Sequence, residues 1–248
     1  PVEEPWRYGV VEVDERKRIV RFKEKPPPEE CFSNLVSVGL YVIEPEALDY
    51  VPEGREFDFA KDLFPLLLKE GYELYAYETD EFWVDIGSLP GYMAAKDWIL
   101  SKQTRRVSEK ASIGNAEIRG NVRVEAGAVI GDDCVIEGPA FIGAKARIEN
   151  GCWIGPGTTV GSGTKIGPNS EIKGSAIFEY VSVGEKAKLD NCVVAEGCCL
   201  GDRVEVEEMA IIGPECTIGS RTKVTKGSRI WPSIRVGEGS VIKGTLLR

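Results

Sequence analysis

The chain has 248 residues, which allows one or two domains, and it carries a formal net charge of −9 with a pI near 4.9. Because a nucleic-acid backbone requires clustered cations, an acidic chain with only isolated basic pairs is not expected to bind nucleic acid. No apolar run approaches the length of a membrane span and no signal peptide is recognisable, so we expect no membrane contact and a cytoplasmic location. The seven cysteines include no Cys-x-x-Cys pair, which is typical of a reducing compartment.

The first hundred residues alternate between β-rich runs and helical stretches, which indicates an α/β fold. Strands are expected at residues 8–14, 18–25, 35–43 and 72–78. Helices are expected at residues 45–50, at 57–70 with Asp58 as the N-cap, and at 88–103. The polar residues 104–111 are expected to form a linker to a second domain.

The rest of the chain contains a six-residue repeat. From Ile118 to Ile242 an aliphatic residue recurs every six positions, and only two of the steps are five residues long. Neither the helix period of 3.6 nor the strand period of 2 explains this spacing. A solenoid does, if each hexad supplies one short strand and one corner, so that three hexads close a triangular coil of about 18 residues. We expect about seven such coils over residues 112–248, with the aliphatic side chains stacked inside.

A small residue stands two places before most of these aliphatic residues. It should also face inward, near a corner where only a small side chain fits. Five of the seven cysteines occupy this position (Cys134, Cys152, Cys192, Cys198 and Cys216), so we interpret them as buried structural residues and not as metal or redox sites.

These repeats, with units such as Thr217-Ile218-Gly219-Ser220, resemble the hexapeptide family of left-handed β-helices. The handedness is implied by the resemblance and not by the spacing. Residues 3–98 resemble the carboxyl-terminal half of the nucleotide-sugar pyrophosphorylase domain. The segments that carry this second resemblance are residues 8–11, 22–26, 34–41, 57–65 and 83–87. With the hexapeptide tail, the chain looks most like the mannose-1-phosphate guanylyltransferases.

The resemblance implies a domain organisation. Residues 1–103 would be the carboxyl-terminal half of a sugar nucleotidyltransferase domain, an α/β partial lobe of the GT-A-like kind. Residues 104–111 would be the linker, and residues 112–248 an all-β left-handed parallel β-helix. Since exposed coil edges template association, we expect a homo-oligomer formed through the β-helix.

The family joins a nucleoside triphosphate to a sugar 1-phosphate and releases pyrophosphate, and its catalysis is positioning plus charge neutralisation with Mg²⁺ as cofactor. By resemblance, Lys25 would bind the sugar phosphate and Glu24 would accept hydrogen bonds from sugar hydroxyls. Asp85 would be one of two Mg²⁺-binding aspartates. The sugar site would further be lined by Gly9, Ser37, Val38 and Gly39.

The sequence also departs from the family pattern. Ser37 stands where these guanylyltransferases commonly have Asn, and neither the glycine-rich nucleotide loop nor the first metal-binding aspartate is present. We therefore expect a fragment with no complete catalytic set, inactive by itself, whose parent acts on a sugar 1-phosphate and a nucleoside triphosphate. The nucleotide base and the sugar stay open.

The lack of histidine bears on two other enzyme classes. Hexapeptide acyltransferases and carbonic anhydrases depend on His as a base or zinc ligand, and this chain contains no His. That count excludes both classes. A non-catalytic assembly or regulatory subunit built on the same domains stays open as the alternative.

Overall fold

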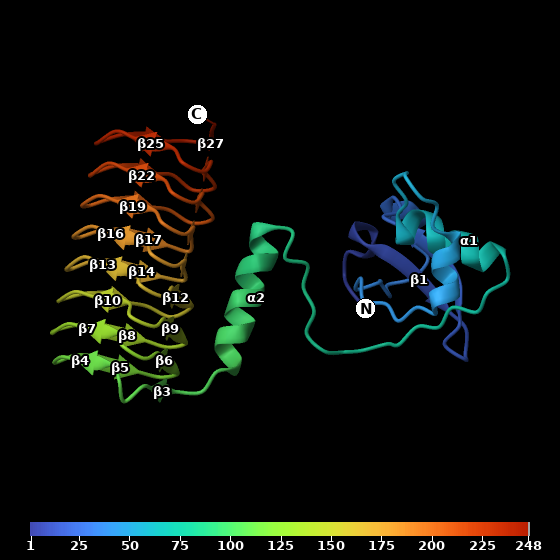
Figure 1. Cartoon of the computed structure of the whole chain (residues 1–248), viewed down its shortest axis with the longest axis horizontal. Helices are drawn as coiled ribbons and strands as arrows, with labels where there is room; N and C mark the ends of the chain where they lie inside the picture. The colour runs from blue at the N-terminus through green and yellow to red at the C-terminus, as the bar shows by residue number, and fades with distance from the viewer. Residues whose placement is uncertain (248) are drawn as a thin grey trace. The chain divides into compact units, whose positions relative to one another are not determined.

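The computed structural model describes residues 1–247 and separates into two compact units (Figure 1). The first unit is Pro1–Trp83 and the second begins at Val84. This division precedes the boundary expected at residue 103, because helix α2 (Leu89–Lys102) packs on the solenoid and belongs to the second unit.

The first unit is built on an antiparallel hairpin of β1 (Gly9–Val13) and β2 (Ile19–Glu24). The other two expected strands are wrong in extent. Residues 35–43 and 72–78 contribute only isolated bridges, Val10 to Val36 and Arg18 to Tyr75. A strand requires a continuous ladder of hydrogen bonds, and beyond each bridge these β-prone runs have no neighbouring backbone to pair with.

Short helical turns complete the first unit. They are the 3₁₀ turns η1 (Pro5–Arg7), η2 (Pro28–Glu30) and η3 (Pro45–Tyr50), the π-helical turn η4 (Phe59–Leu63) and helix α1 (Phe64–Lys69). Asp58 is the predicted N-cap, and its carboxylate accepts hydrogen bonds from the backbone of Ala60 and Lys61 at 2.8 Å each. Leu63, Phe64 and Leu67 form a small core cluster of the unit, and Val10 and Val11 of β1 are also buried.

The second unit contains a solenoid of three parallel sheets. Sheet I consists of β3 (Arg106–Val107), β6 (Val122–Val124), β9 (Ala140–Ile142), β12 (Thr158–Val160), β15 (Ala176–Ile177), β18 (Val193–Val194), β21 (Ile211–Ile212), β24 (Arg229–Ile230) and β27 (Thr245–Leu246). Sheet II consists of β4 (Ser112–Ile113), β7 (Val129–Ile130), β10 (Arg147–Ile148), β13 (Lys165–Ile166), β16 (Ser182–Val183), β19 (Cys199–Leu200), β22 (Thr217–Ile218) and β25 (Arg235–Val236). Sheet III consists of β5 (Glu117–Arg119), β8 (Val135–Glu137), β11 (Trp153–Ile154), β14 (Glu171–Lys173), β17 (Lys188–Asp190), β20 (Glu205–Val206), β23 (Lys223–Val224) and β26 (Val241–Ile242).

One strand from each sheet makes one tier, and over residues 106–242 there are eight tiers where about seven were expected. The first tier begins inside the expected linker, because Val107 pairs in parallel register with Val124 and so starts sheet I early. We number the tiers from one (β3 to β5) to eight (β24 to β26).

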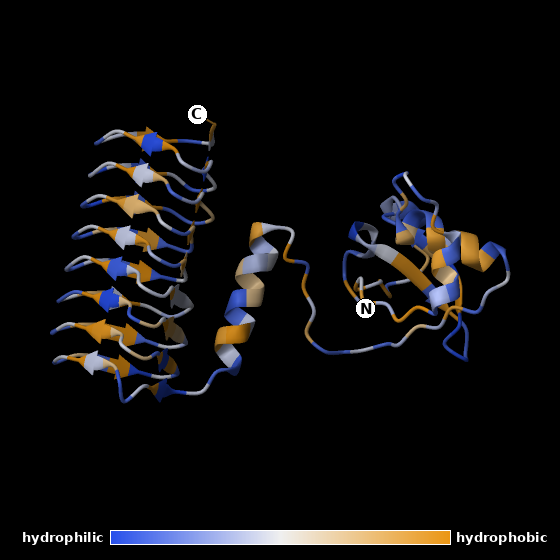
Figure 2. Ribbon diagram, viewed as in Figure 1, coloured by the Kyte–Doolittle hydropathy of each residue, from blue (hydrophilic) through white to orange (hydrophobic). Residues whose placement is uncertain are grey.

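The six-residue repeat is confirmed as the interior of the solenoid. Ile130, Ile148 and Ile166 stand in register on successive strands and are at most 1% exposed. Figure 2 shows hydrophobic and hydrophilic residues side by side in these two-residue strands. The five-residue steps are shortened corners that leave the register intact, since Ile177 still pairs with Val194.

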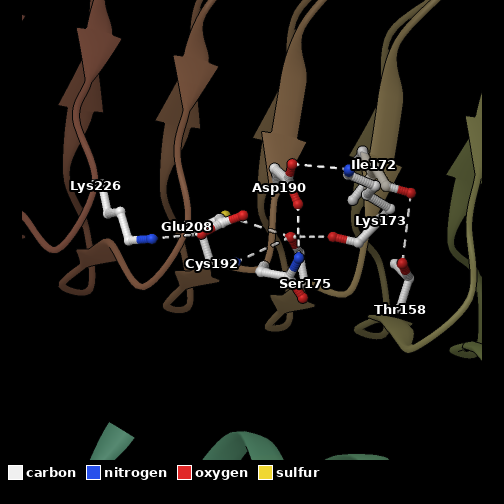
Figure 3. Close-up of polar contacts among 9 residues, drawn as sticks. Thr158, Ile172, Lys173, Ser175, Asp190, Cys192, Glu208 and Lys226 are labelled. Atoms are coloured by element: carbon white, nitrogen blue, oxygen red, sulfur yellow. Dashed lines mark hydrogen bonds and ion pairs between the residues drawn. The ribbon is translucent and has the colours of Figure 1, made fainter. Parts of the chain in front are cut away.

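Many of the small inward residues are hydrogen-bond donors, and they link one tier to the next by hydrogen bonds to backbone carbonyls. The Cys134 thiol donates to the Glu149 carbonyl at 3.0 Å, and the Ser170 hydroxyl donates to the Gly184 carbonyl at 2.9 Å. Figure 3 shows Thr158 reaching the Ile172 carbonyl and Ser175 beside Cys192. The position therefore selects for small size and, at many tiers, also for a donor.

Helix α2 lies on sheet I. Its N-cap is Ser88, whose hydroxyl accepts from the Gly91 backbone, and Met93 packs on Ala176 and Val193. The buried Lys96 ammonium donates to the carbonyls of Gly157 and Gly174, the latter at 2.7 Å. Within residues 1–247, no helix is both long enough and apolar enough to cross a bilayer.

Candidate functional site

The hairpin brings four of the predicted sugar-site residues to one place. Gly9 on β1 stands opposite Glu24 on β2. The Ser37 backbone donates to the Gly9 carbonyl at 2.8 Å, and the Lys25 backbone donates to the Tyr8 carbonyl at 3.0 Å. Residues from three separate sequence motifs therefore meet at the end of the hairpin where β1 begins and β2 finishes.

Glycine at position 9 lets two side chains approach the backbone closely. A Cβ atom there would lie 2.7 Å from Glu24 Oε2 and 2.8 Å from Phe22 Cζ, so the Glu24 carboxylate lies directly over the Gly9 backbone. Lys25 follows with a φ of +44° and is exposed. Within residues 1–247 neither Glu24 nor Lys25 forms an ion pair, while the neighbouring Lys23 pairs with Glu30. The Glu24 carboxylate and the Lys25 ammonium are therefore both available to a ligand.

The segment from Ser37 to Gly39 forms a polar bend beside this cluster. The Ser37 hydroxyl accepts from the Gly39 backbone at 3.3 Å, and Gly39 has a φ of +77°. The Tyr41 hydroxyl lies 3.0 Å from Ser37 Oγ and was not among the predicted site residues. The signal for Tyr41 was present, because it ends the same motif that begins at Asn34. Val38 and Gly39 are exposed.

Asp85 belongs to the second unit. Its Oδ1 accepts from the Gly87 backbone at 2.8 Å, which leaves Oδ2 free on an exposed carboxylate. Its carbonyl oxygen packs against Gly91, where an added Cβ would come within 1.9 Å, so Asp85 is held firmly at the start of α2.

The described residues do not form a complete magnesium site. Among residues 1–247 there is no group of three or more His, Cys, Asp or Glu side chains that could hold a metal ion. Mg²⁺ prefers near-octahedral oxygen coordination, and Asp85 offers one free carboxylate oxygen.

The buried thiols are not candidate nucleophiles. Burial raises the pKa of Cys152 to about 11 and those of Cys192 and Cys198 to about 12, so all three stay protonated near neutral pH. The structural interpretation of the inward cysteines is confirmed by their burial.

Comparisons with known families agree with the two-part organisation. A family described as "Nucleotidyl transferase" matches residues 1–102, and one described as "GMPPB C-terminal domain" matches residues 136–239. The chain belongs to the nucleotidyltransferase family. Its relatives in this family are sugar-1-phosphate nucleotidyltransferases that differ in both nucleotide and sugar.

Three of these relatives illustrate the range. The UTP–glucose-1-phosphate uridylyltransferase of Synechocystis is 36% identical over 82% of this chain and 53% of its own length. The mannose-1-phosphate guanylyltransferase catalytic subunit beta of Drosophila melanogaster is 36% identical over 86% of this chain and 52% of its own. The glucose-1-phosphate adenylyltransferase of Bacillus cereus is 30% identical over 86% and 52%. This nucleotidyltransferase chain therefore spans about half the length of the curated relatives it matches.

Among solved structures, the UDP-N-acetylglucosamine acyltransferase from Campylobacter jejuni aligns over 56% of this chain and 72% of its own, with 19% identity and a TM-score of 0.42. That likeness is one of fold alone.

Proposed function

We propose that this chain forms the sugar-phosphate-binding part and the β-helical part of a sugar-1-phosphate nucleotidyltransferase, with mannose-1-phosphate guanylyltransferase as the activity of the parent protein. The observation that carries the proposal is the meeting of Gly9, Glu24, Lys25 and Ser37 at one end of the hairpin. The match of residues 136–239 to the GMPPB C-terminal domain supports the mannose assignment.

Each residue has a defined task in this proposal. The Lys25 ammonium binds the phosphate of the sugar 1-phosphate as a charge-assisted hydrogen-bond donor. The Glu24 carboxylate, fixed over Gly9, accepts hydrogen bonds from the sugar hydroxyls. Ser37, Val38 and Gly39 line the same site, and the hydrogen bond from Ser37 to Gly9 holds their bend against the hairpin. Asp85 would supply one ligand of a catalytic Mg²⁺.

We further propose that the chain alone does not turn over. Triphosphate binding in this chemistry uses backbone N–H groups of a glycine-rich loop, and no such loop occurs in the sequence. The purified chain with Mg²⁺, mannose 1-phosphate and GTP, or glucose 1-phosphate and UTP, is expected to release no pyrophosphate above a protein-free blank. Release that scales with chain concentration would refute this part.

A binding titration tests the sugar-phosphate site directly. When mannose 1-phosphate is added to the chain and the titration is followed by NMR, the amide signals of Gly9, Lys25 and Gly39 should shift. Lys25→Ala should weaken binding about tenfold or more, because a charge-assisted contact to the phosphate is lost. Lys23→Ala is the matched control, since Lys23 lies two residues away and already pairs with Glu30.

Equal weakening by both substitutions would assign the effect to net charge and not to the site. Absence of binding in the wild-type chain would remove the sugar-phosphate site and favour the alternative, a non-catalytic assembly or regulatory subunit. Self-association through the β-helix and a cytoplasmic location belong to the same proposal and hold under either function.

A further inference from the structure

The solenoid has one edge on which the charges of tiers three to seven are separated by sign. This edge is the corner between sheets I and II together with the outward residues of sheet II, and we call it the bipolar edge. Its basic half, in tiers one to four, consists of Lys110, Lys145, Arg147 and Lys165. Its acidic half, in tiers five to seven, consists of Glu179, Glu196 and Glu215.

The corner residues are aligned by backbone hydrogen bonds from tier to tier. Lys145 donates to Ala126, Gly197 donates to Glu179, and Glu215 donates to Glu196. The corner charges therefore lie in a column along the solenoid axis, with about 4.8 Å between successive tiers. Arg147 and Lys165 stand beside this column on the outward face of sheet II. All seven residues are exposed.

These charges have no partners within the chain. Among residues 1–247, none of the seven forms an ion pair, whereas most other solenoid cations do. Sheet III shows the contrast, because its outward residues Glu171, Lys188, Glu205 and Lys223 alternate in sign along the register.

On the bipolar edge like charges are instead placed side by side. Arg147 and Lys165 stand directly opposite one another on β10 and β13, an arrangement that destabilises a sheet unless another group neutralises it. An unpaired basic half and an unpaired acidic half on one edge are self-complementary.

We infer that two copies of this chain associate antiparallel along the bipolar edge, related by a two-fold axis that passes between tiers four and five. Tiers three and four of each copy, which are basic, then face tiers five and six of the other, which are acidic. Lys165 meets Glu179 of the second copy, and the pair Lys145 and Arg147 meets Glu196 of the second copy. Both contacts occur twice, as a closed isologous interface requires.

Two further residues fit this arrangement. Glu109 in tier one would face Arg235 in tier eight of the second copy and offset the like charge that Lys110 of the same tier presents to Arg235. Tyr180 lies in tier five, next to the proposed axis, and is 73% exposed. Its ring covers Gly163 of tier four, and an exposed tyrosine at the centre of a patch is typical of an interface anchor.

Self-association through this edge is independent of the sugar-phosphate site in the first unit. The inference specifies the surface and symmetry of an oligomer. If the sugar-phosphate site is refuted, the dimer interface is unaffected, and the reverse also holds.

Sedimentation equilibrium of the purified chain should show a dimer that dissociates as NaCl rises from about 50 mM to about 500 mM, because exposed ion pairs are screened by salt.

Charge reversal distinguishes this interface from any other. A basic-to-acidic variant carries Lys145→Glu, Arg147→Glu and Lys165→Glu. An acidic-to-basic variant carries Glu179→Lys, Glu196→Lys and Glu215→Lys. Each variant alone places like charges across the axis and should raise the dimer Kd about 100-fold or more. An equimolar mixture of the two restores opposite charges at every contact and should form dimers again.

The control variant carries Lys61→Glu, Lys69→Glu and Lys243→Glu, the same change in net charge as the basic-to-acidic variant at exposed residues that are not part of the bipolar edge, and should dimerise like the wild-type chain. Thermal unfolding of all variants should stay close to wild type, since the reversed residues are exposed. A monomeric wild-type chain, reversed variants that still dimerise, or a mixture that stays monomeric would each overturn the inference.

Discussion

At the scale of single residues, the inward cysteines show how one position serves two purposes. The repeat indicates that the position two places before each aliphatic residue must be small. The structure adds that the Cys198 thiol donates to the Gly213 carbonyl at 3.0 Å, and that the Thr222 hydroxyl donates to the Gly237 carbonyl at the same distance. Cysteine satisfies both demands because it is small, largely apolar and still a weak donor.

These thiols predict a pH dependence of stability. Burial is the first cause of the raised pKa of Cys192, which reaches about 12 against an ordinary value of 9.0. Below about pH 9 the thiol is protonated in both states, so its stabilising effect is fully present. As the pH rises further, the unfolded chain loses this proton while the folded chain keeps it, so the free energy of unfolding must fall.

Urea unfolding at about pH 8 and about pH 10.5 measures this fall, which should be about 2 kcal/mol from Cys192. Cys192→Ala should lessen the drop, whereas Cys199→Ala should leave it unchanged, because Cys199 is exposed. An identical pH slope in the wild-type and Cys192→Ala chains would contradict the assignment.

At the scale of elements, α2 shows what a correct helix prediction leaves open. The expected helix at residues 88–103 is present as Leu89–Lys102, and it packs on the solenoid and belongs to the second unit. Its periodicity does not reveal this partner, because the decisive contact is polar. Lys96 is buried and meets the carbonyls of two successive tiers, while the Gln103 amide donates to the Ala140 carbonyl at 2.9 Å.

Lys96→Met should loosen α2 without unfolding the solenoid. Methionine keeps the aliphatic length but removes the donors, so the Gly157 and Gly174 carbonyls lose this partner at a cost of about 1–3 kcal/mol. Hydrogen exchange should show faster exchange of the α2 amides and unchanged protection of β12 and β15. Lys102→Met, on an exposed residue of the same helix, is the control. Equal α2 protection in wild type and Lys96→Met would show that the apolar contacts of Met93 suffice.

At the scale of the whole molecule, the two units differ in the size of their cores. The first unit buries Leu63, Phe64 and Leu67, with partly buried neighbours around them. The solenoid core is continuous through the tiers, from Val122 to Val236, and each tier stabilises the next. We therefore expect two separate thermal transitions, with the first unit unfolding at the lower temperature.

Matched core substitutions assign the transitions. Leu67→Ala and Ile148→Ala each remove a buried aliphatic side chain and should each cost about 2–5 kcal/mol. In calorimetry, Leu67→Ala should lower only the first transition and Ile148→Ala only the second. Val129→Ala, on an outward residue of the neighbouring strand β7, should move neither. A single transition shifted by both core substitutions would show that the units unfold together.

The sequence predicted the grouping of the candidate site residues better than it predicted the strands around them. Gly9, Glu24, Lys25 and Ser37 were expected together, and the hairpin brings them together. The expected strands at residues 35–43 and 72–78 were largely wrong, because β propensity reports a side chain's fitness for a sheet and not the presence of a neighbouring strand. Asp85 was expected as one of two Mg²⁺-binding aspartates, and its described contacts are with Gly87 and with Gly91 at the start of α2. The role of each of these residues stays a prediction.

The six-residue repeat by itself determined the solenoid, its inward residues and its cysteine positions, because a period is a local property that any one coil displays. Only the tertiary structure decided that α2 joins the solenoid, that the first of eight tiers begins at Arg106, and that opposite charges separate along one edge. Those features depend on residues about 18 or more positions apart that become neighbours when the tiers stack, and spacing within one hexad carries no record of them.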